Sequence, residues 1–456
     1  MGKVFFIGIG GEGMNKLALL LRDFEDDVSG SDIRESIETR KLRNYGIKVF
    51  IGHNKSHISK DINYVIYSSA ISPLNEELVQ AKKLGIKTEK RGEALARVVK
   101  RFKNIVVAGT HGKTTTTAMI GHILKSSGKS VNAYIGAEDE EFNEFDKNAD
   151  LFVLEADESD RTFLLLAPDI LVVTNIGMDH LNAYNNNFEN LKKAFRTLYN
   201  NSKVRVVCKD DRNAFSIANH YSDKNTFFYS IRDERTAIFA KNFEYLPEGI
   251  TFDFYFEGTF IKRGFVPAYG EKNVSDALSA ITVAHLMGVS FERSIDALKT
   301  FTMPHRRIEI KGEINGVTVI DDHADDNVEA EVVLKAVRKH FPNRRIIAVF
   351  QPHRYSRVNM LREKLGKPFY LADIIITTDI YPAFEKPIEG INGELVNSWV
   401  KEQNKEKDVF YAPRLVDALK ILEKILKRND LVVLLGSGDV WSISPYLLNF
   451  LKRSEL

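Results

Sequence analysis

The sequence predicts an α/β fold with parallel sheets, arranged as three successive units along the chain. Short apolar runs alternate with amphipathic stretches, which is the pattern of parallel sheets covered by helices. Two of the apolar runs lead directly into glycine-rich loops that precede helix-compatible segments. A chain of 456 residues is too long for one ordinary core, and its 44% hydrophobic and 28% charged residues are typical of a globular protein.

The first unit opens on a strand and a helix, and this order is then repeated. Val4–Ile9 has the continuous apolar character of a buried strand, and Met14–Asp23 follows with helical spacing. Val28–Ser31 and Tyr64–Ser68 are expected to be further strands of the same sheet. Helical spacing returns over Pro73–Leu84, so this unit is predicted to be a parallel sheet with helices.

A connection and then a second unit follow. Arg97–Asn104 is basic and lacks strong periodicity, so we expect a linker there. Residues 205–265 are predicted to be rich in strands, because Phe252, Phe254 and Phe256 alternate. The other elements expected in this unit are strands at Ile105–Ala108, Leu151–Leu154 and Ile170–Thr174 and a helix at Asp276–Met287.

The third unit begins after Met303-Pro304 and again has the α/β pattern. Helical segments separate its apolar runs, so they are expected to form another parallel sheet. The predicted strands are Val317–Ile320, Ile346–Phe350, Ile374–Thr378 and Leu431–Leu435.

Composition and the N-terminus exclude several classes of protein. The formal net charge of +2 is too small to indicate a nucleic-acid partner. Met1–Ile7 has no signal-peptide features, and no apolar run approaches the roughly 20 residues that span a bilayer. The single cysteine, Cys208, cannot form an internal disulfide, and we expect it to be buried and inert. These features predict a cytoplasmic protein without a membrane partner.

The loop Gly109–Thr117 predicts ATP binding. It follows a β-branched strand and leads into a helix, so backbone N–H groups and the positive helix end would face phosphate. Lys113 would reach the β- and γ-phosphates, and the Thr114 hydroxyl would help to hold magnesium. Val107 stands where the general motif has its first glycine, and the alternative interpretation is an ordinary loop.

Polar residues follow the next two predicted strands. Glu155–Asp160 comes directly after Leu154, and Asp179-His180 follows the strand that ends at Thr174. Ligands of open parallel sheets lie beyond the carboxyl ends of the strands, so these loops could form one magnesium site with Thr114. The alternative is that the carboxylates cap a helix and solvate a loop.

A second glycine loop lies near the N-terminus. Gly8–Gly13 has the spacing G-x-G-x-x-G between a strand and a helix, and Asp32 follows a second strand. Taken alone, this pattern would indicate an NAD-dependent oxidoreductase. Physically the motif requires only a close approach of backbone to a diphosphate, which a nucleotide-linked substrate also satisfies. Two diphosphate-binding loops in one chain favour a ligase.

These motifs together resemble the Mur ligase family over essentially the whole chain. The matching segments are Gly8–Met14, Tyr67–Ile71, Gly109–Thr117, Glu155–Asp160, Thr174–Ile176, Asp179-His180, Arg306-Arg307, Asp321-Asp322 and Gln351–Arg357. The resemblance implies a UDP-binding Rossmann-like domain at 1–100, a central P-loop ATPase-type domain at 101–302 and a C-terminal Rossmann-like domain at 303–456. It also implies ATP-dependent amide formation on a UDP-linked cell-wall precursor through an acyl phosphate, with Mg²⁺.

The resemblance also implies the residues of each site. Lys113, Glu155 and His180 would be catalytic, and Thr114, Glu155 and His180 would hold the metal. The ATP-binding residues would be Gly109, Thr110, His111, Gly112, Lys113, Thr114, Thr115, Asn273, Asp276, Arg306, Arg307 and Asp322. The UDP-binding residues would be Gly8, Gly10, Gly11, Gly13, Met14, Asp32, Ser68 and Ser69. The amino-acid-binding residues would be Asp325, His353, Arg354 and Arg357, since paired arginines can hold a carboxylate.

The sequence departs from the family pattern where substrates would be recognised. Asp321–Asn327 reads Asp-Asp-His-Ala-Asp-Asp-Asn where bacterial members usually have Asp-Asp-Tyr-Ala-His-His-Pro, so imidazoles are replaced by carboxylates. Lys272–Asp276 departs near the adenine, and Asn15 replaces a small hydroxyl residue. A ligase that builds pseudomurein, as in some methanogenic archaea, is therefore an alternative. A non-ligating ATPase and the NAD-dependent oxidoreductase are alternatives from other classes.

Overall fold

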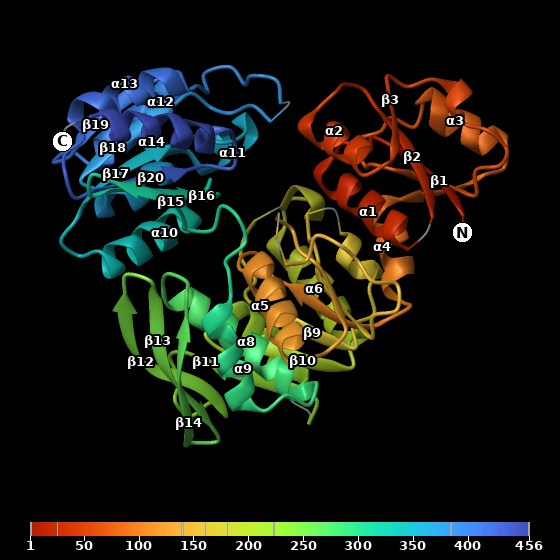
Figure 1. The fold of residues 1–456 in the computed structure, drawn as a ribbon, viewed down its shortest axis with the longest axis horizontal. Helices are drawn as coiled ribbons and strands as arrows, with labels where there is room; N and C mark the ends of the chain where they lie inside the picture. Colours follow the sequence, from red (N-terminus) through yellow and green to blue (C-terminus); the bar gives the residue numbers. More distant parts are fainter. Residues whose placement is uncertain are drawn as a thin grey trace. The chain divides into compact units, whose positions relative to one another are not determined.

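The chain folds into α/β structure with three sheets, as the computed structural model in Figure 1 shows. The structure describes residues 2–24, 26–137, 139, 141–159, 161–179, 181–221, 224–383 and 385–454. The chain forms two compact units. The first contains Met1–Lys241, Phe254–Lys262 and Ser275–Leu298; the second contains Asn242–Asp253, Arg263–Val274 and Lys299–Leu456. The predicted fold class is confirmed.

The first sheet has five parallel strands in the order β3-β2-β1-β4-β5. Its strands are β1 (Lys3–Ile7), β2 (Asp27–Asp32), β3 (Lys48–Ile51), β4 (Tyr64–Tyr67) and β5 (Lys87–Lys90). Its helices are α1 (Glu12–Asp23), α2 (Ile37–Asn44), α3 (Glu76–Lys83) and α4 (Arg91–Val99). Buried residues of α1, α2 and α4 pack on one face of this sheet, and Leu78 and Ala81 of α3 pack on the other.

The second sheet has nine strands in the order β14-β13-β12-β11-β10-β9-β6-β8-β7. Its strands are β6 (Lys103–Ala108), β7 (Val131–Tyr134), β8 (Leu151–Glu155), β9 (Ile170–Val173), β10 (Val204–Cys208), β11 (Thr226–Ser230), β12 (Ile238–Leu246), β13 (Gly249–Phe256) and β14 (Thr259–Val266). The helices in this part of the chain are α5 (Lys113–Ser126), α6 (Phe188–Asn201), α7 (Arg212–Ala218), α8 (Glu271–Leu286) and α9 (Phe291–Ala297). The carboxyl ends of the parallel neighbours β6, β8 and β9 lie at the same edge of the sheet.

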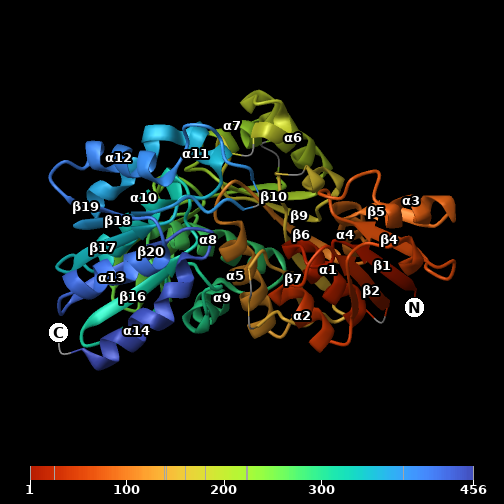
Figure 2. The same cartoon turned by 90° about the horizontal axis from the view of Figure 1, so that it is seen from above.

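The third sheet has six strands in the order β15-β16-β20-β17-β18-β19, and only β15 runs antiparallel. Its strands are β15 (Glu309–Ile314), β16 (Val317–Asp322), β17 (Arg345–Phe350), β18 (Ile374–Thr378), β19 (Asp408–Ala412) and β20 (Asp430–Leu435). Its helices are α10 (Asn327–His340), α11 (Tyr355–Leu361), α12 (Gly393–Gln403), α13 (Leu415–Ile425) and α14 (Ser444–Arg453). Helices α10 to α12 cover one face and α13 and α14 the other (Figure 2).

The linker predicted at Arg97–Asn104 is too long at both ends, because α4 continues to Val99 and β6 begins at Lys103, which leaves residues 100–102 as the connection. The helix buries Ala94, Leu95 and Val98, but basic side chains on its other face obscure this periodicity in the sequence. Arg97, for example, pairs with Glu89 at 3.1 Å and lies over the ring of Tyr64.

Two further expectations concern burial and the membrane. Cys208 is buried in the first compact unit, as predicted, with its sulfur 3.7 Å from the Ser275 hydroxyl. Within the described part of the chain, no helix is long and apolar enough to cross a membrane.

Candidate active site

The loop between β6 and α5 has the backbone form of a phosphate loop. Gly109 and Gly112 have φ angles of 143° and 82°, in the region that favours glycine. A Cβ on Gly109 would lie 2.2 Å from the Thr174 hydroxyl, so a side chain does not fit there. Gly112 directly precedes the helix that starts at Lys113, so the N–H groups of the first turn lie next to this loop.

The end of β9 holds the loop in place through Asn175. The backbone N–H of His111 donates to the Asn175 side chain at 3.0 Å, and the Asn175 amide donates back to the His111 carbonyl at 2.7 Å. The Thr110 hydroxyl accepts the N–H of Gly177 at 2.7 Å. The sequence placed Asn175 in the matching segment Thr174–Ile176 but gave it no role of its own, and its position just beyond a strand end was the available signal.

Lys113 is half-buried and is held by its own loop and by a buried carboxylate, that of Glu158. Its ammonium donates to the Gly109 carbonyl at 2.6 Å and to the Glu158 carboxylate at 2.9 Å. Burial alone would lower the pKa of Lys113, but the charges of Glu158, Glu155 and Asp157 outweigh it and raise that pKa. Lys113 therefore stays charged. Glu158 was not among the predicted site residues.

Hard oxygen ligands lie beside the loop, at the end of β8. The Thr114 hydroxyl donates to Glu155 at 2.8 Å, and the same Glu155 oxygen accepts the Gly136 N–H at 3.0 Å. Lys113 thus faces three carboxylates, and a hydroxyl lies next to one of them. This is the donor chemistry of a magnesium site, so the residues fit that ion. Thr115 is buried in α5.

Part of the predicted metal segment lies outside the described residues. His180, which was predicted to be catalytic and to hold the metal, is among these, as is Asp160. Asp179 is described and follows β9.

The N-terminal glycine loop is braced by the end of β2. The carbonyl of Ser31 accepts the N–H groups of Gly8 at 2.8 Å and Ile9 at 3.0 Å. The Asp32 carboxylate accepts the Gly10 N–H at 2.9 Å, so Asp32 supports the loop itself. Gly8 has a φ of 80°, which allows the turn.

The other predicted UDP-binding residues differ in exposure. Met14 is buried in the core, and Ser69 is exposed beyond β4. Ser68 lies next to Gly8, since a Cβ on Gly8 would be 3.3 Å from that of Ser68. Gly11 directly precedes α1, and Gly13 lies in its first turn, where its carbonyl accepts the Tyr134 hydroxyl at 3.0 Å.

In the second compact unit, Arg306 and Asp322 reach the carboxyl ends of β16 and β20. Arg306 pairs with Asp321 at 3.0 Å and donates to the Gly436 carbonyl. Asp322 accepts the backbone N–H groups of Ile308 at 2.7 Å and Ala324 at 2.8 Å. Burial raises the pKa of Asp322 to about 6.

Three further residues were predicted to bind ATP. Arg307, which precedes β15 in the sequence, is half-buried. Asn273, in α8, donates to the Tyr269 carbonyl at 2.7 Å, and Asp276, one turn later, is almost fully buried.

Asp325 joins the ends of β16, β17 and β20. This buried carboxylate pairs with Arg357, lies 3.0 Å from Nδ1 of His353 and accepts the Ser437 hydroxyl. The predicted carboxylate-binding residue Arg357 is thus already paired within the protein. Arg354, by contrast, is exposed, and its φ of 64° is unusual for a residue with a side chain.

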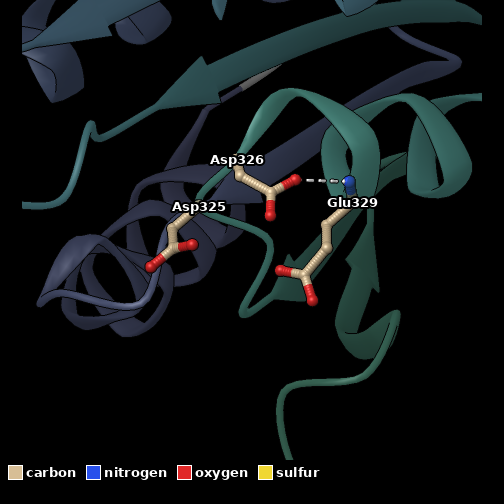
Figure 3. A group of neighbouring side chains, drawn as sticks. All are labelled: Asp325, Asp326 and Glu329. Carbon is tan, nitrogen blue, oxygen red and sulfur yellow. Dashed lines mark hydrogen bonds between the residues drawn. The ribbon is translucent and has the colours of Figure 1, made fainter. Parts of the chain in front are cut away.

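Three neighbouring carboxylates lie at the start of α10, those of Asp325, Asp326 and Glu329, and their oxygens fall within 4.8 Å of one another (Figure 3). Asp326 is the N-cap of α10 and accepts the N–H groups of Val328 and Glu329 at 2.8 Å. These bonds satisfy one oxygen of the buried Asp326 carboxylate.

The three α/β sheets, a phosphate loop and a second diphosphate-type loop define a nucleotide-dependent ligase. Family models match nearly all of the chain: the Mur ligase family catalytic domain at 3–103, the Mur ligase middle domain at 107–284 and the Mur ligase glutamate ligase domain at 306–438. The chain belongs to the Mur ligase family. It is an ATP-dependent, ADP-forming acid–amino-acid ligase. This assignment replaces the oxidoreductase and non-ligating ATPase hypotheses.

Similar proteins match over the full length. UDP-N-acetylmuramate–L-alanine ligase of Sulfurihydrogenibium sp. (strain YO3AOP1) is 37% identical over 99% of this chain and 98% of its own. The enzyme of that name from Persephonella marina is 38% identical over 99% and 97%. The structure of UDP-N-acetylmuramate–alanine ligase from Thermotoga maritima matches with a TM-score of 0.84 and 27% identity, covering both chains fully. A pseudomurein peptide ligase type C from Methanothermus fervidus shares the fold, with a TM-score of 0.67 and 20% identity over 99% of this chain and all of that one.

Proposed function

We propose that this ligase joins an amino acid to the carboxylate of a UDP-linked cell-wall precursor, with UDP-N-acetylmuramate and L-alanine as its substrates. Two hydrogen-bonded pairs beside the phosphate loop, Lys113 with Glu158 and Thr114 with Glu155, are the observation that carries the ATP- and Mg²⁺-dependent step. Full-length relatives at 37% identity that are named UDP-N-acetylmuramate–L-alanine ligase support the choice of substrates.

The domains would divide the work as the resemblance implies. Residues 1–100 would bind the UDP-linked precursor, 101–302 would bind ATP, and 303–456 would receive the amino acid. The glycine loop at Gly8–Gly13 supports the first role, and the phosphate loop supports the second. Reactants of this kind are cytoplasmic, so we propose that the enzyme works there.

The first chemical step brings a carboxylate against the γ-phosphate of ATP. An oxygen of the precursor's carboxylate forms a bond to phosphorus, and the bond to the β-phosphate oxygen breaks, which releases ADP and leaves an acyl phosphate. Two anions repel each other on this path, so positive charge near both is required. Lys113 supplies a fixed charge, and the N–H groups at the start of α5 donate to phosphate oxygens.

Thr114 and Glu155 are the described residues that would hold magnesium, with His180 as a further proposed ligand. The ion would neutralise charge on the phosphates. Glu158 would keep Lys113 oriented until phosphate replaces the carboxylate as its partner, since the two groups lie 2.9 Å apart.

In the second step the amine of the amino acid attacks the acyl carbon. The carbon–oxygen bond to phosphate breaks, an amide forms, and the amine loses a proton. Exposed Arg354 would hold the amino-acid carboxylate, with Arg357 and His353 beside it. Asp322 and Arg306 would contact the nucleotide.

A pseudomurein peptide ligase is the second candidate, and one observation favours it. Asp325, which stands where the family pattern has an imidazole, pairs with Arg357 and so changes the charge presented to the acceptor. A different amine or carboxylate could then be preferred.

Phosphate release in the presence of ATP and Mg²⁺ would test both candidates. UDP-N-acetylmuramate and UDP-linked amino acids should each be combined with every common amino acid, and the amide products identified by mass spectrometry. Turnover with UDP-N-acetylmuramate and L-alanine is expected. Turnover only with UDP-linked amino acids or peptides would replace the first candidate by the second.

A further inference from the structure

A buried carboxylate lies beneath the N-terminal glycine loop and takes no part in the chemistry above. Glu77, in the first turn of α3, is 0% exposed. It accepts the Ser31 hydroxyl at 2.6 Å and the Asn54 backbone N–H at 3.2 Å. The Nδ1 atoms of His53 and His57 lie 2.8 Å and 2.7 Å from its two oxygens. Four polar groups therefore surround one charge in the core.

These partners connect segments that are distant in the sequence. Ser31 belongs to β2, whereas His53, Asn54 and His57 follow β3. An isolated charge in the core would cost far more than a surface charge, so such a carboxylate persists only where donors satisfy it. Glu77 thus holds the ends of two neighbouring strands against α3.

The arrangement does not have the form of a hydrolytic triad. The Ser31 hydroxyl lies 3.1 Å from Nδ1 of His53, and Glu77 approaches that same nitrogen. A serine nucleophile needs a base whose other ring nitrogen is held by the carboxylate. Ser31 is also fully buried, so the contacts indicate a supporting role.

Ser31 connects Glu77 to the glycine loop through hydrogen bonds. Its side chain is held by Glu77, while its carbonyl accepts the N–H groups of Gly8 and Ile9, the first two of the loop. The next residue, Asp32, accepts the Gly10 N–H. The position of the loop's backbone therefore depends on the end of β2. That end is held in turn by the Glu77 carboxylate, which accepts the Ser31 hydroxyl.

We propose that Glu77 is a positioning residue for the nucleotide diphosphate of the UDP-linked substrate. It acts through Ser31 on the Gly8–Gly10 turn, and His53 and His57 hold the carboxylate in place. This inference rests on the proposed UDP-binding role of the loop.

UDP itself is the probe, with binding measured by isothermal titration calorimetry on the full chain. Glu77→Gln keeps the shape of the side chain but replaces one accepting oxygen by an amide NH₂, which faces groups that also donate. Because a buried donor then lacks an acceptor, we expect UDP affinity to fall about tenfold. Ser31→Ala removes the hydroxyl that links β2 to Glu77 and that lies 3.1 Å from His53, and a loss of about threefold to tenfold is expected. Glu76→Gln is the matched control, because Glu76 is the exposed neighbour on the same helix, and it should bind UDP like the wild type.

Kinetics and hydrogen exchange separate positioning from general destabilisation. In both variants KM for the UDP-linked substrate should rise, while kcat at saturation and KM for ATP stay within about twofold of the wild type. Amide exchange should accelerate in the peptide that contains Gly8–Gly10 and remain unchanged around Gly109–Thr117.

Several outcomes would overturn the proposal. Folded Glu77→Gln and Ser31→Ala proteins with wild-type UDP affinity would show that the carboxylate does not position the loop. If Glu77→Gln fails to fold, the Ser31→Ala result alone decides. A wild-type chain that binds no UDP would remove the proposed substrate class itself, and the inference with it.

Discussion

Two pairs of a half-buried cation and a buried carboxylate lie at strand ends in different sheets, and they differ in their balance of charge. Lys113 faces Glu158 beside the phosphate loop, and Arg357 faces Asp325 at the ends of β16 and β17. Around Lys113 the carboxylates are in excess, since Glu155 and Asp157 also raise its pKa. A divalent cation suits such a group.

The second pair is balanced by its own neighbours. Burial alone would raise the pKa of Asp325, but His353, Arg357 and Ser437 hold it well below its ordinary value. Two strand-end sites with similar residues therefore differ in how their charges are paired. Beside Lys113 there are carboxylates beyond its partner Glu158, whereas the single carboxylate of Asp325 is held by Arg357, His353 and Ser437 together.

Removing the cation of the first pair should have the largest effect. Lys113→Ala is expected to abolish turnover, with kcat reduced by about 10³-fold or more, because phosphoryl transfer depends on charge neutralisation. ATP-dependent phosphate release would measure this. Lys125→Ala, an exposed residue of the same helix, is the control, and appreciable activity of Lys113→Ala would contradict the proposed mechanism.

Neutralising the partner of that lysine should have a smaller effect. In Glu158→Gln the amide still accepts a hydrogen bond from Lys113 but no longer carries the charge that orients it. We expect kcat/KM for ATP to fall about tenfold to a hundredfold, with KM for the amino acid unchanged. An unchanged kcat/KM for ATP would show that the pair has only a structural role.

Asp325→Asn removes the negative charge from the pair formed by Arg357 and Asp325. This change leaves the Arg357 charge available, so KM for the amino acid is expected to fall about threefold to tenfold if the acceptor carboxylate binds there. Asp325→His, which restores the family residue, shows whether preference among amino acids changes as well. A rise in KM for the amino acid in Asp325→Asn would indicate that Asp325 itself contacts the substrate.

A last expected effect is on stability rather than on turnover and concerns Asp322. Because burial raises the pKa of Asp322 to about 6, its ionised form is disfavoured in the folded chain. Its contribution to the free energy of unfolding is therefore highest below about pH 4. That contribution falls by up to about 3 kcal/mol as the pH rises to about 6, and it stays low above that pH. The pH dependence of unfolding should lose this component in Asp322→Asn. Wild-type and variant curves that run parallel from pH 4 to 7 would contradict the shift.

Much of the fold could be predicted from the sequence because its signals are local. The strand before the phosphate loop, the glycines at 109 and 112 and the helix from Lys113 lie within one continuous segment. The linker predicted at Arg97–Asn104 is too long because the basic residues Arg97, Lys100, Arg101 and Lys103 conceal the end of α4 and the start of β6. The contacts of Asn175 and Glu158 were missed because they join different strand ends.

The sequence by itself determined the class of the enzyme, since the order and spacing of the motifs are local properties that the family shares. Only the tertiary structure decided which polar side chains meet. Glu158 with Lys113, Asp325 with Arg357 and Glu77 with Ser31 are separated by 45, 32 and 46 residues. Parallel strands bring such residues to one edge of a sheet, and the electrostatic energy of each pair depends on that distance and on burial, neither of which is encoded in the local spacing.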